Sequence, residues 1–233
     1  VICLVAVVGR TRYCIHPREE VRTIPIVGGT KSVDWQKVED LRPDLVVMDR
    51  EENTREMAEA CPTAWLATHV TSLESVGRDL MLLGKQLGAS QLEGLASNWL
   101  RIADIPDASF QGWASIPGIK QTIGESATGI EYLDYMIWRD PWMAVGPDTF
   151  IGSMLRKVGL GAFIKKYSDP YPQITNILPE PDTFYLFSTE PYPFKRHSEE
   201  LAEQGFQGAL IDGELYSWFG IRSYEMLEAQ LNT

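Results

Sequence analysis

Short apolar runs alternate with stretches of mixed polarity along the first third of the chain. Apolar runs that end at glycine, proline or charged residues are typical of buried strands, and apolar positions at helical spacing predict helices. The predicted strands are residues 2–8, 23–27, 45–48 and 64–67, and the predicted helices are residues 32–41 and 53–61. This alternation indicates βαβ units and a mostly parallel sheet, so the predicted fold class is α/β.

Two capping boxes in the middle of the chain predict two successive helices. Thr71 and Glu74 open the first, and Ser90 and Glu93 open the second. The apolar stripe loses its phase between the two boxes, and Gly88 is well placed to end the first helix. At ~1.5 Å per residue the second helix, predicted to run to residue 103, reaches roughly 20 Å, which is long enough to connect two lobes.

The second half of the chain begins with a stretch that has little periodicity. Residues 107–129 are rich in glycine, proline and serine, and we predict a linker there. The alternation of strands and helices then resumes. The predicted strands are residues 132–138, 183–187 and 208–211, and the predicted helices are residues 148–158, 194–204 and 223–231.

Composition narrows the class of protein. Of the 233 residues, 44% are hydrophobic and 23% are charged, which are ordinary globular values. The net charge of -11 disfavours nucleic acid and anionic lipid as partners, because both need a basic face. It is compatible with docking onto a basic protein surface, and equally with a role in solubility alone. No apolar run approaches the ~20 residues of a membrane helix, and three cysteines without CxxC spacing form neither a disulfide scaffold nor a zinc finger.

Polar and aromatic side chains follow the predicted strands in both halves. Residues 9–17 come directly after the first apolar run, and ligands of open α/β sheets bind outside the carboxyl ends of the strands. We expect this segment to face a cleft, with a solvated loop as an equal alternative. In the second half, Trp142 and Trp218 lie beside proline or glycine and predict a lined pocket. Trp138 continues a strand and is expected to pack inward.

Common enzyme motifs are absent. The glycines of residues 124–129 are one position too far apart for GxSxG, and residues 28–32 lack the spacing of a phosphate loop. Cys14 and His16 are two positions apart, which is close enough for a metal site or a thiol–base pair. His69 is the candidate for a third metal ligand, and no metal is assigned. We therefore expect no enzyme activity.

Several segments, taken in order, resemble one protein family. They are residues 9–17, 27–31, 41–46, 51–53, 137–143, 188–194 and 212–214, followed by Trp218. The set resembles the helical-backbone (class III) substrate-binding proteins of ABC importers. Within that family it is most similar to the vitamin B12-binding-like subgroup, the helical backbone metal receptors. The likeness covers nearly the whole chain.

The resemblance implies two α/β lobes with mostly parallel sheets flanked by helices. A single long backbone helix joins the lobes, and the ligand cleft lies between them. We expect an N-terminal lobe at residues 1–89, the backbone helix at residues 90–106 and a C-terminal lobe at residues 107–233.

The resemblance also implies a function and its partners. The protein would capture a metal-containing macrocycle or chelate, with a corrinoid such as cobalamin expected first and a ferric siderophore or haem second. Expected partners are this small molecule and the membrane subunits of an ABC permease. Nucleic acid, membrane insertion and a resident cofactor are not expected, and a monomer is. The expected location is the periplasm or cell envelope, with the cytoplasm as an alternative because no signal peptide is visible.

Site residues follow from the same resemblance. Tyr13 is expected to contact the ligand from the first lobe, with Cys14 or His16 as helpers that could reach a metal. Arginines are expected to pair with acidic groups of the ligand. The full set expected at the ligand is Arg10, Arg12, Tyr13, Cys14, His16, Arg139, Trp142, Met143, Tyr216, Trp218, Phe219 and Arg222. Glu52 or Glu56 on the first lobe and Glu190 on the second are expected to dock onto permease arginines.

One departure from the family and two rival functions stay open. The family has a turn and a helix after its first strand, whereas Val5 here runs directly into Ala6. We favour residues omitted from the sequence over a true deletion, and an intact mass of only 26.2 kDa would exclude omission. The rivals are a cytoplasmic chelatase-like enzyme of similar shape and a bare-metal receptor that uses Cys14, His16 and His69.

Overall fold

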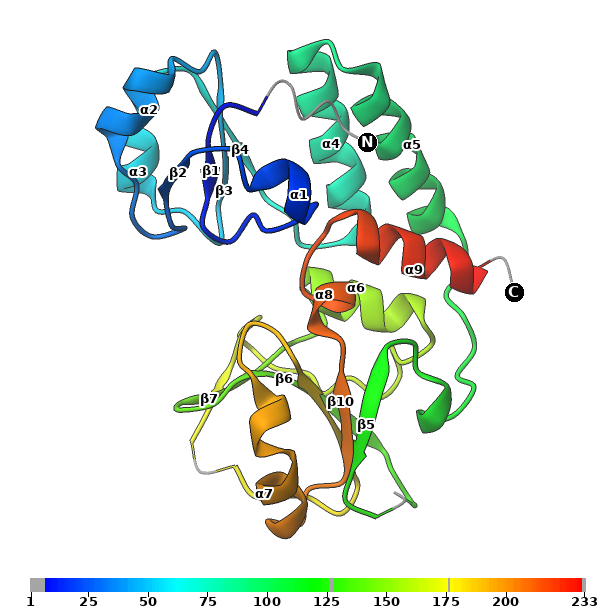
Figure 1. Ribbon diagram of the computed structural model, residues 1–233. Coiled ribbons are helices and arrows are strands. Elements are labelled where there is room, and N and C mark those ends of the chain that lie inside the picture. The colour runs from blue at the N-terminus through cyan, green and yellow to red at the C-terminus, as the bar shows by residue number, and fades with distance from the viewer. Residues whose placement is uncertain (1–6, 126–127, 176, 232–233) are drawn as a thin grey trace. The chain divides into compact units, whose positions relative to one another are not determined.

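The computed structural model describes residues 7–125, 128–175 and 177–231 (Figure 1). The chain forms two compact units. The first unit comprises Val1–His69 and Asp79–Ala96, and the second comprises Val70–Arg78 and Ser97–Thr233. Most of the strand predicted at residues 2–8 lies outside the described residues.

Two parallel strand pairs form the sheets of the first unit. β1 (Arg10–Thr11) pairs with β2 (Ile26–Gly28), and β3 (Val46–Asp49) pairs with β4 (Trp65–Thr68). β3 and β4 confirm the strands predicted at residues 45–48 and 64–67, and each lies one residue later than predicted. β2 covers only the end of its predicted run, because Pro25 lacks the backbone N–H that a strand needs.

Short helices connect these strands. They are α1 (Arg18–Val21), α2 (Trp35–Leu41) and α3 (Arg55–Glu59). The prediction that Ser32 caps α2 is wrong, because the carboxylate of Asp34 accepts the hydrogen bond from the backbone N–H of Lys37. Thr54 caps α3 in the same way through the N–H of Met57.

The two central helices are confirmed as separate elements. α4 (Leu73–Leu87) ends before Gly88, whose φ of 61° lies in the left-handed region, and α5 (Ser90–Asp104) follows. The capping box of α4 lies one residue later than predicted. Ser72 Oγ accepts from the N–H of Ser75, and Ser75 Oγ accepts from the N–H of Ser72. In the described part of the chain, no helix has the length and apolarity needed to cross a membrane.

A six-stranded sheet in the order β5-β10-β9-β6-β7-β8 forms the centre of the second unit. Its middle strands are parallel: β6 (Tyr132–Trp138), β9 (Thr183–Ser188) and β10 (Gly208–Ile211). The outer strands are antiparallel: β5 (Ile119–Ile123), β7 (Trp142–Ala144) and β8 (Gln173–Ile174). The three parallel strands were all predicted, and every residue of β9 and β10 is buried. The α/β fold class is therefore confirmed.

The predicted linker at residues 107–129 is partly wrong. Residues 119–123 form β5, an edge strand whose Thr122 lies opposite Ala209 of β10. A short 3-10 helix, η2 (Trp113–Ser115), comes before it, and the Trp113 ring stacks on Phe184 at 4.5 Å. Residues 119–123 form a strand although their local sequence predicts a linker, because they pair with β10, which lies far away in the sequence.

Helices pack on both the sheet and one another in the second unit. α6 (Phe150–Lys157) begins at Thr149, which accepts from the N–H of Gly152, rather than at the predicted Asp148. The predicted helix at residues 194–204 divides into η3 (Phe194–His197) and α7 (Ser198–Glu203). α8 (Gly213–Tyr216) and α9 (Ile221–Leu231) close the chain.

The core of the second unit is rich in aromatic side chains. Phe187 of β9, Phe194 of η3 and Leu201 of α7 are fully buried within one cluster. Trp99 of α5 is also fully buried, and its ring lies 6.3 Å from Phe150. This core places the loops that follow β6, β9 and β10 at one end of the sheet (Figure 1).

Candidate functional site

In the first unit, loops that follow the strands are tied to one another. Asn53 Nδ2 donates to the carbonyl of Thr30 at 2.8 Å, and Lys31 Nζ donates to the carbonyl of Glu51 at 2.9 Å. These bonds join the loop after β2 to the loop after β3. The carboxyl ends of β2 and β3 are therefore linked through their loops, although the two strand pairs form separate sheets.

Arg10 braces the loop that follows β1. Its Nε donates to the carbonyl of Val21 at 2.7 Å, and its Nη1 donates to the carbonyls of Thr11 and Cys14 at 3.2 and 3.1 Å. The guanidinium of the other arginine here, Arg12, lies over Gly29. Arg10 therefore reaches a ligand only by giving up backbone partners, and its predicted ligand contact stays a prediction.

The tip of this loop is open to solvent. Tyr13 is 56% exposed, and Cys14 and His16 are also exposed. The Sγ of Cys14 lies 3.4 Å from Thr11 Oγ1. Among the described residues, no group of three or more histidine, cysteine, aspartate and glutamate side chains could hold a metal ion, so the bare-metal receptor gains no support there.

In the second unit, the turn after β6 carries an engaged arginine. Arg139 donates to both carboxylate oxygens of Glu200, at 2.9 Å from Nη1 and 2.5 Å from Nη2. Its guanidinium also lies 5.3 Å from the ring centre of Trp142. The hydrogen bond to Glu200 raises the pKa of Arg139, and Arg139, followed by His197, lowers the pKa of Glu200 to about 2.

Of the two tryptophans beside this turn, Trp138 differs from expectation. Trp142 stacks on Phe194 with 5.9 Å between ring centres and is half-buried against the core cluster. Met143 beside it is also half-buried. Trp138 was expected to pack inward, but it is 40% exposed and contacts Tyr192 edge to face at 5.5 Å. As the last residue of β6, it extends past the core that buries the rest of the strand.

The segment after β10, which consists of α8 and the loop that follows it, contains both buried and exposed aromatic residues. Tyr216 is fully buried, and its hydroxyl donates to the carbonyl of Pro117 at 2.9 Å. Burial raises the pKa of Tyr216. Trp218 is 41% exposed, and Phe219 is exposed except where its ring meets Phe150. Arg222 pairs with Glu214. Trp218 and Phe219 are therefore available to a ligand in this structure, whereas Tyr216 is not.

The three predicted docking carboxylates are exposed on loops or a helix start. Glu52 follows β3, and Glu56 lies in the first turn of α3, where backbone N–H groups lower its pKa. Glu190 follows β9, and its N–H donates to Ser188 Oγ at 3.3 Å. A Cβ on Gly213 would lie 2.8 Å from the Cβ of Glu190, so this glycine lets the two loops approach.

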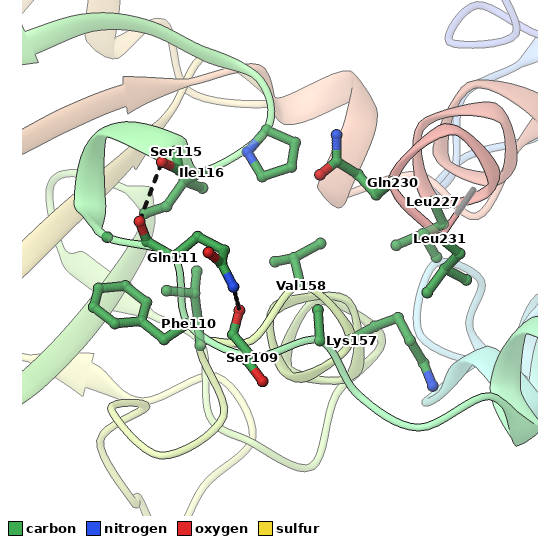
Figure 2. Close-up of a pocket in the computed structure, with 14 residues that line it drawn as sticks. Ser109, Phe110, Gln111, Ser115, Ile116, Lys157, Val158, Leu227, Gln230 and Leu231 are labelled. Atoms are coloured by element: carbon green, nitrogen blue, oxygen red, sulfur yellow. Dashed lines mark hydrogen bonds between the residues drawn. The ribbon is translucent and has the colours of Figure 1, made fainter. Parts of the chain in front are cut away.

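Two cavities among the described residues, one in each unit, do not coincide with the predicted ligand residues. One, of about 60 Å³, lies in the second unit. Figure 2 shows Phe110, Ile116, Val158 and Leu227 around it. Another, of about 380 Å³, lies on the first unit beside the end of α2. Ligand sites usually measure ≈ 300–1,000 Å³. The first cavity is too small for a macrocycle, and neither is lined by an aromatic residue of the predicted site.

Comparison with known proteins adds the fold family. No family model and no curated protein matches the chain. Solved structures do match: the Vibrio cholerae periplasmic vitamin B12-binding protein BtuF has a TM-score of 0.60 at 14% identity, over 95% of this chain and 85% of that one. S. aureus IsdE, complexed with heme, has a TM-score of 0.66 at 13% identity, and the match covers 97% of this chain and 90% of IsdE. The periplasmic heme-binding protein BhuT has a TM-score of 0.62 at 15% identity, and the match covers 96% of this chain and 86% of BhuT.

The chain has the fold of these binding proteins. The resemblance seen in the sequence is thereby supported at the level of structure, and at this identity the likeness shows the fold alone.

Sequence reasoning missed part of the site in the second unit. Tyr192, His197 and Glu200 surround Arg139, and none of them belongs to the set expected at the ligand. One signal was present: an arginine directly after a buried strand needs an acidic partner. The carboxylate lies 61 positions further along the chain, however, so spacing alone does not identify it.

Proposed function

We propose that this protein is the substrate-binding component of an ABC importer and captures a metal-containing macrocycle or chelate. One observation carries the proposal beyond the fold. Each unit exposes aromatic side chains at or beyond the carboxyl ends of its strands. Tyr13 follows β1 in the first unit; in the second, Trp138 is the last residue of β6, and Trp218 and Phe219 lie in the loop between α8 and α9. Exposed aromatic rings gathered at strand ends are suited to bury the flat apolar surface of a macrocycle.

A corrinoid is the first proposed ligand, and haem or a ferric siderophore the second. Three predicted ligand arginines already have partners within the protein, namely Arg10, Arg139 and Arg222. Ligand carboxylates would have to compete with those partners. A corrinoid periphery carries mainly neutral amides, so it makes the least demand on these arginines. Among the solved structures of this fold, one binds vitamin B12 and others bind heme.

The remaining parts of the proposal follow from the family resemblance. The ligand is held in the expected interlobe cleft, and the protein acts as a monomer in the periplasm or cell envelope. Glu52 or Glu56 and Glu190 dock onto basic residues of the permease, and their exposure supports this. The chelatase-like enzyme is the alternative. It requires turnover that His16→Gln abolishes while ligand binding is kept.

A tryptophan fluorescence titration tests the proposal. Cyanocobalamin, haemin and a ferric siderophore are added separately, and we expect cyanocobalamin to quench the emission with saturation. Calorimetry confirms the affinity because it is free of absorption by the ligand. Absence of binding for all three ligands overturns the proposed function.

A matched pair of variants locates the site. Trp218→Leu removes a side chain that is 41% exposed at the carboxyl end of the sheet. Trp65→Leu removes one that is 47% exposed, but at the first residue of β4, the opposite end of its strand. We expect the first variant to weaken binding at least about tenfold, since an aromatic contact contributes about 1.4 kcal/mol. The second should bind as the wild type does. Equal losses in both would contradict the proposed location.

A further inference from the structure

Three hydroxyl groups of the second unit form a hydrogen-bonded chain at the carboxyl end of its sheet. The hydroxyl of Tyr135, on β6, lies 3.3 Å from Ser188 Oγ, at the end of β9, and 3.5 Å from Ser217 Oγ. Tyr135 and Ser188 are fully buried, and Ser217 directly follows α8. The Oγ of Ser188 also donates to the carbonyl of Glu190 and accepts from its N–H at 3.3 Å. This hydroxyl chain therefore runs from the segment after α8 to the loop after β9.

The protons of the hydroxyl chain have one consistent direction. Each hydroxyl group has a single proton to donate. The proton of Ser188 goes to the carbonyl of Glu190, so Ser188 accepts from Tyr135, and Tyr135 can then only accept from Ser217. Burial raises the pKa of Tyr135 to about 12, so its hydroxyl keeps this proton at neutral pH. Removal of the Tyr135 hydroxyl therefore costs a hydrogen bond on each side of it.

The backbone joins the same two segments. The N–H of Thr189 donates to the carbonyl of Ile211 at 3.0 Å, and the N–H of Gly213 donates to Thr189 Oγ1 at 3.0 Å. A Cβ on Gly213 would lie 2.4 Å from Ser188 Oγ and 2.7 Å from the backbone nitrogen of Glu190. The start of α8 thus lies against the loop after β9 with no side chain between them. In such close packing, a shift of one segment displaces the other.

The hydroxyl chain ends beside one residue of each proposed surface. Trp218 directly follows Ser217 and is 41% exposed, and its carbonyl accepts from Ser223 Oγ. It belongs to the aromatic residues proposed to contact the ligand. Glu190, at the other end, is exposed and is the proposed docking residue of this unit. A ligand on Trp218 would restrain the segment that contains Ser217, and the hydroxyl chain connects that segment to Glu190.

We propose that Tyr135, Ser188 and Ser217 are positioning residues that couple Trp218 to the loop of Glu190, so that a bound ligand orders this loop for the permease. The inference rests on the proposed function, because Trp218 must contact the ligand and Glu190 the permease. Tyr135 and Ser188 are buried, so they act on both surfaces only through their neighbours. Coupling between two sites requires an element whose order both sites influence, and the loop after β9 is that element.

Hydrogen exchange of the free protein, followed by mass spectrometry, tests the coupling without ligand. Tyr135→Phe removes only the hydroxyl group, and exchange at residues 189–190 should become about threefold faster or more, the effect of losing about one net hydrogen bond. Ser217→Ala, at the far end of the hydroxyl chain, should accelerate the same amides about twofold, because hydrogen bonds in a chain strengthen one another. The double variant should be no faster than Tyr135→Phe, since the chain is already broken there.

Ser153→Ala is the matched control for these variants. Ser153 is a buried serine of α6, and its hydroxyl donates to the carbonyl of Phe150, within the same helix, at 2.7 Å. Its removal should leave exchange at residues 189–190 unchanged. Wild-type exchange there in Ser217→Ala overturns the coupling. A double variant that exchanges faster than Tyr135→Phe also overturns it, since the two hydroxyls then act independently.

The same amides are then measured with saturating cyanocobalamin. We expect the ligand to slow exchange at residues 189–190 about twofold or more in the wild type, and not in Tyr135→Phe, although this variant should bind within about threefold of the wild-type affinity. A purely structural role for Tyr135 would leave the response to ligand in place. If bound cyanocobalamin slows exchange equally in both proteins, or in neither, the coupling is wrong. If cyanocobalamin does not bind, the proposed ligand is wrong, and the free-protein variants alone decide the coupling.

Discussion

Lys157, the last residue of α6, connects α6 to the end of α5 within the second unit, and Lys157→Met removes this connection while keeping most of the apolar stem. The side chain is only 5% exposed. Its Nζ donates to the carbonyls of Ala103, at 3.2 Å, and Ile105, and it lies 3.1 Å from the carboxylate of Asp107. Two of these acceptors lie at the end of α5, where carbonyls have no partner within the helix.

The expected loss of stability follows from these contacts. A hydrogen bond to a charged group contributes about 1.5–3 kcal/mol, and two carbonyls lose one each. Asp107 is half exposed and adds little. The expected loss of stability is about 3 kcal/mol, the lower end of the sum of these two hydrogen bonds, because the variant no longer has to desolvate an ammonium group. For a chain of this size, that corresponds to a decrease of about 6–12 °C in Tm.

Urea unfolding followed by circular dichroism measures this change, with Lys85→Met as the control. Lys85 is exposed in the last turn of α4, so its removal should alter the free energy of unfolding by less than about 1 kcal/mol. The reasoning is refuted if Lys157→Met costs no more than the control. It is also refuted if the unfolding slope changes and the midpoint does not, since the loss is assigned to the folded state.

Three further predictions concern a close packing contact and two titrating groups. Gly208→Ala would place a Cβ 1.9 Å from the carbonyl oxygen of Tyr185, so thermal unfolding should show a loss of stability above about 3 kcal/mol. The control Gly220→Ala has open space around the new Cβ and should lose no more than about 1 kcal/mol of stability. Equal losses in the two variants would contradict this. Burial raises the pKa of Tyr135 to about 12, so its contribution to stability is complete below pH 10 and lost as pH rises toward 12; Tyr135→Phe should flatten that decline in urea unfolding. The pKa of Glu200 is lowered from 4.5 to about 2, so its contribution to stability is present above pH 4.5 and lost as pH falls toward 2. If the stability of Glu200→Gln falls with acid in the same way as that of the wild type, this contribution of Glu200 is excluded.

The buried parallel strands could be predicted from sequence with good boundaries. β6, β9 and β10 are largely apolar because residues on both of their faces are buried. β3 and β4 are also largely apolar, although Val47 and Trp65 remain about half exposed. Each run carries its own signal, whatever it pairs with.

Elements that depend on a distant partner could not be predicted in this way. β5 has polar residues at its centre and lies inside a segment rich in glycine and proline, and it becomes a strand by pairing with β10. The three caps that were misplaced by one or two residues, at Asp34, Ser72 and Thr149, depend on side-chain torsion angles that composition does not reveal.

The candidate site shows the same division. Sequence pattern placed exposed aromatic residues after the strands, and Tyr13, Trp218 and Phe219 are exposed there. It did not distinguish these from Tyr216, which is equally aromatic and only two positions from Trp218 but is fully buried. Burial depends on what packs over a residue, and the ring of Tyr216 is covered by residues from other parts of the chain.

By itself the sequence determined the α/β class, the order of the central strands along the chain, and the aromatic and polar character of the loops that follow them. These properties depend on local periodicity and on residue type. The tertiary structure alone decided that Arg139 is held by Glu200 and His197, and that Trp138 is exposed while Trp142 packs on the core. Those contacts join residues that lie about sixty positions apart, and their geometry exists only once the sheet and α7 have packed together.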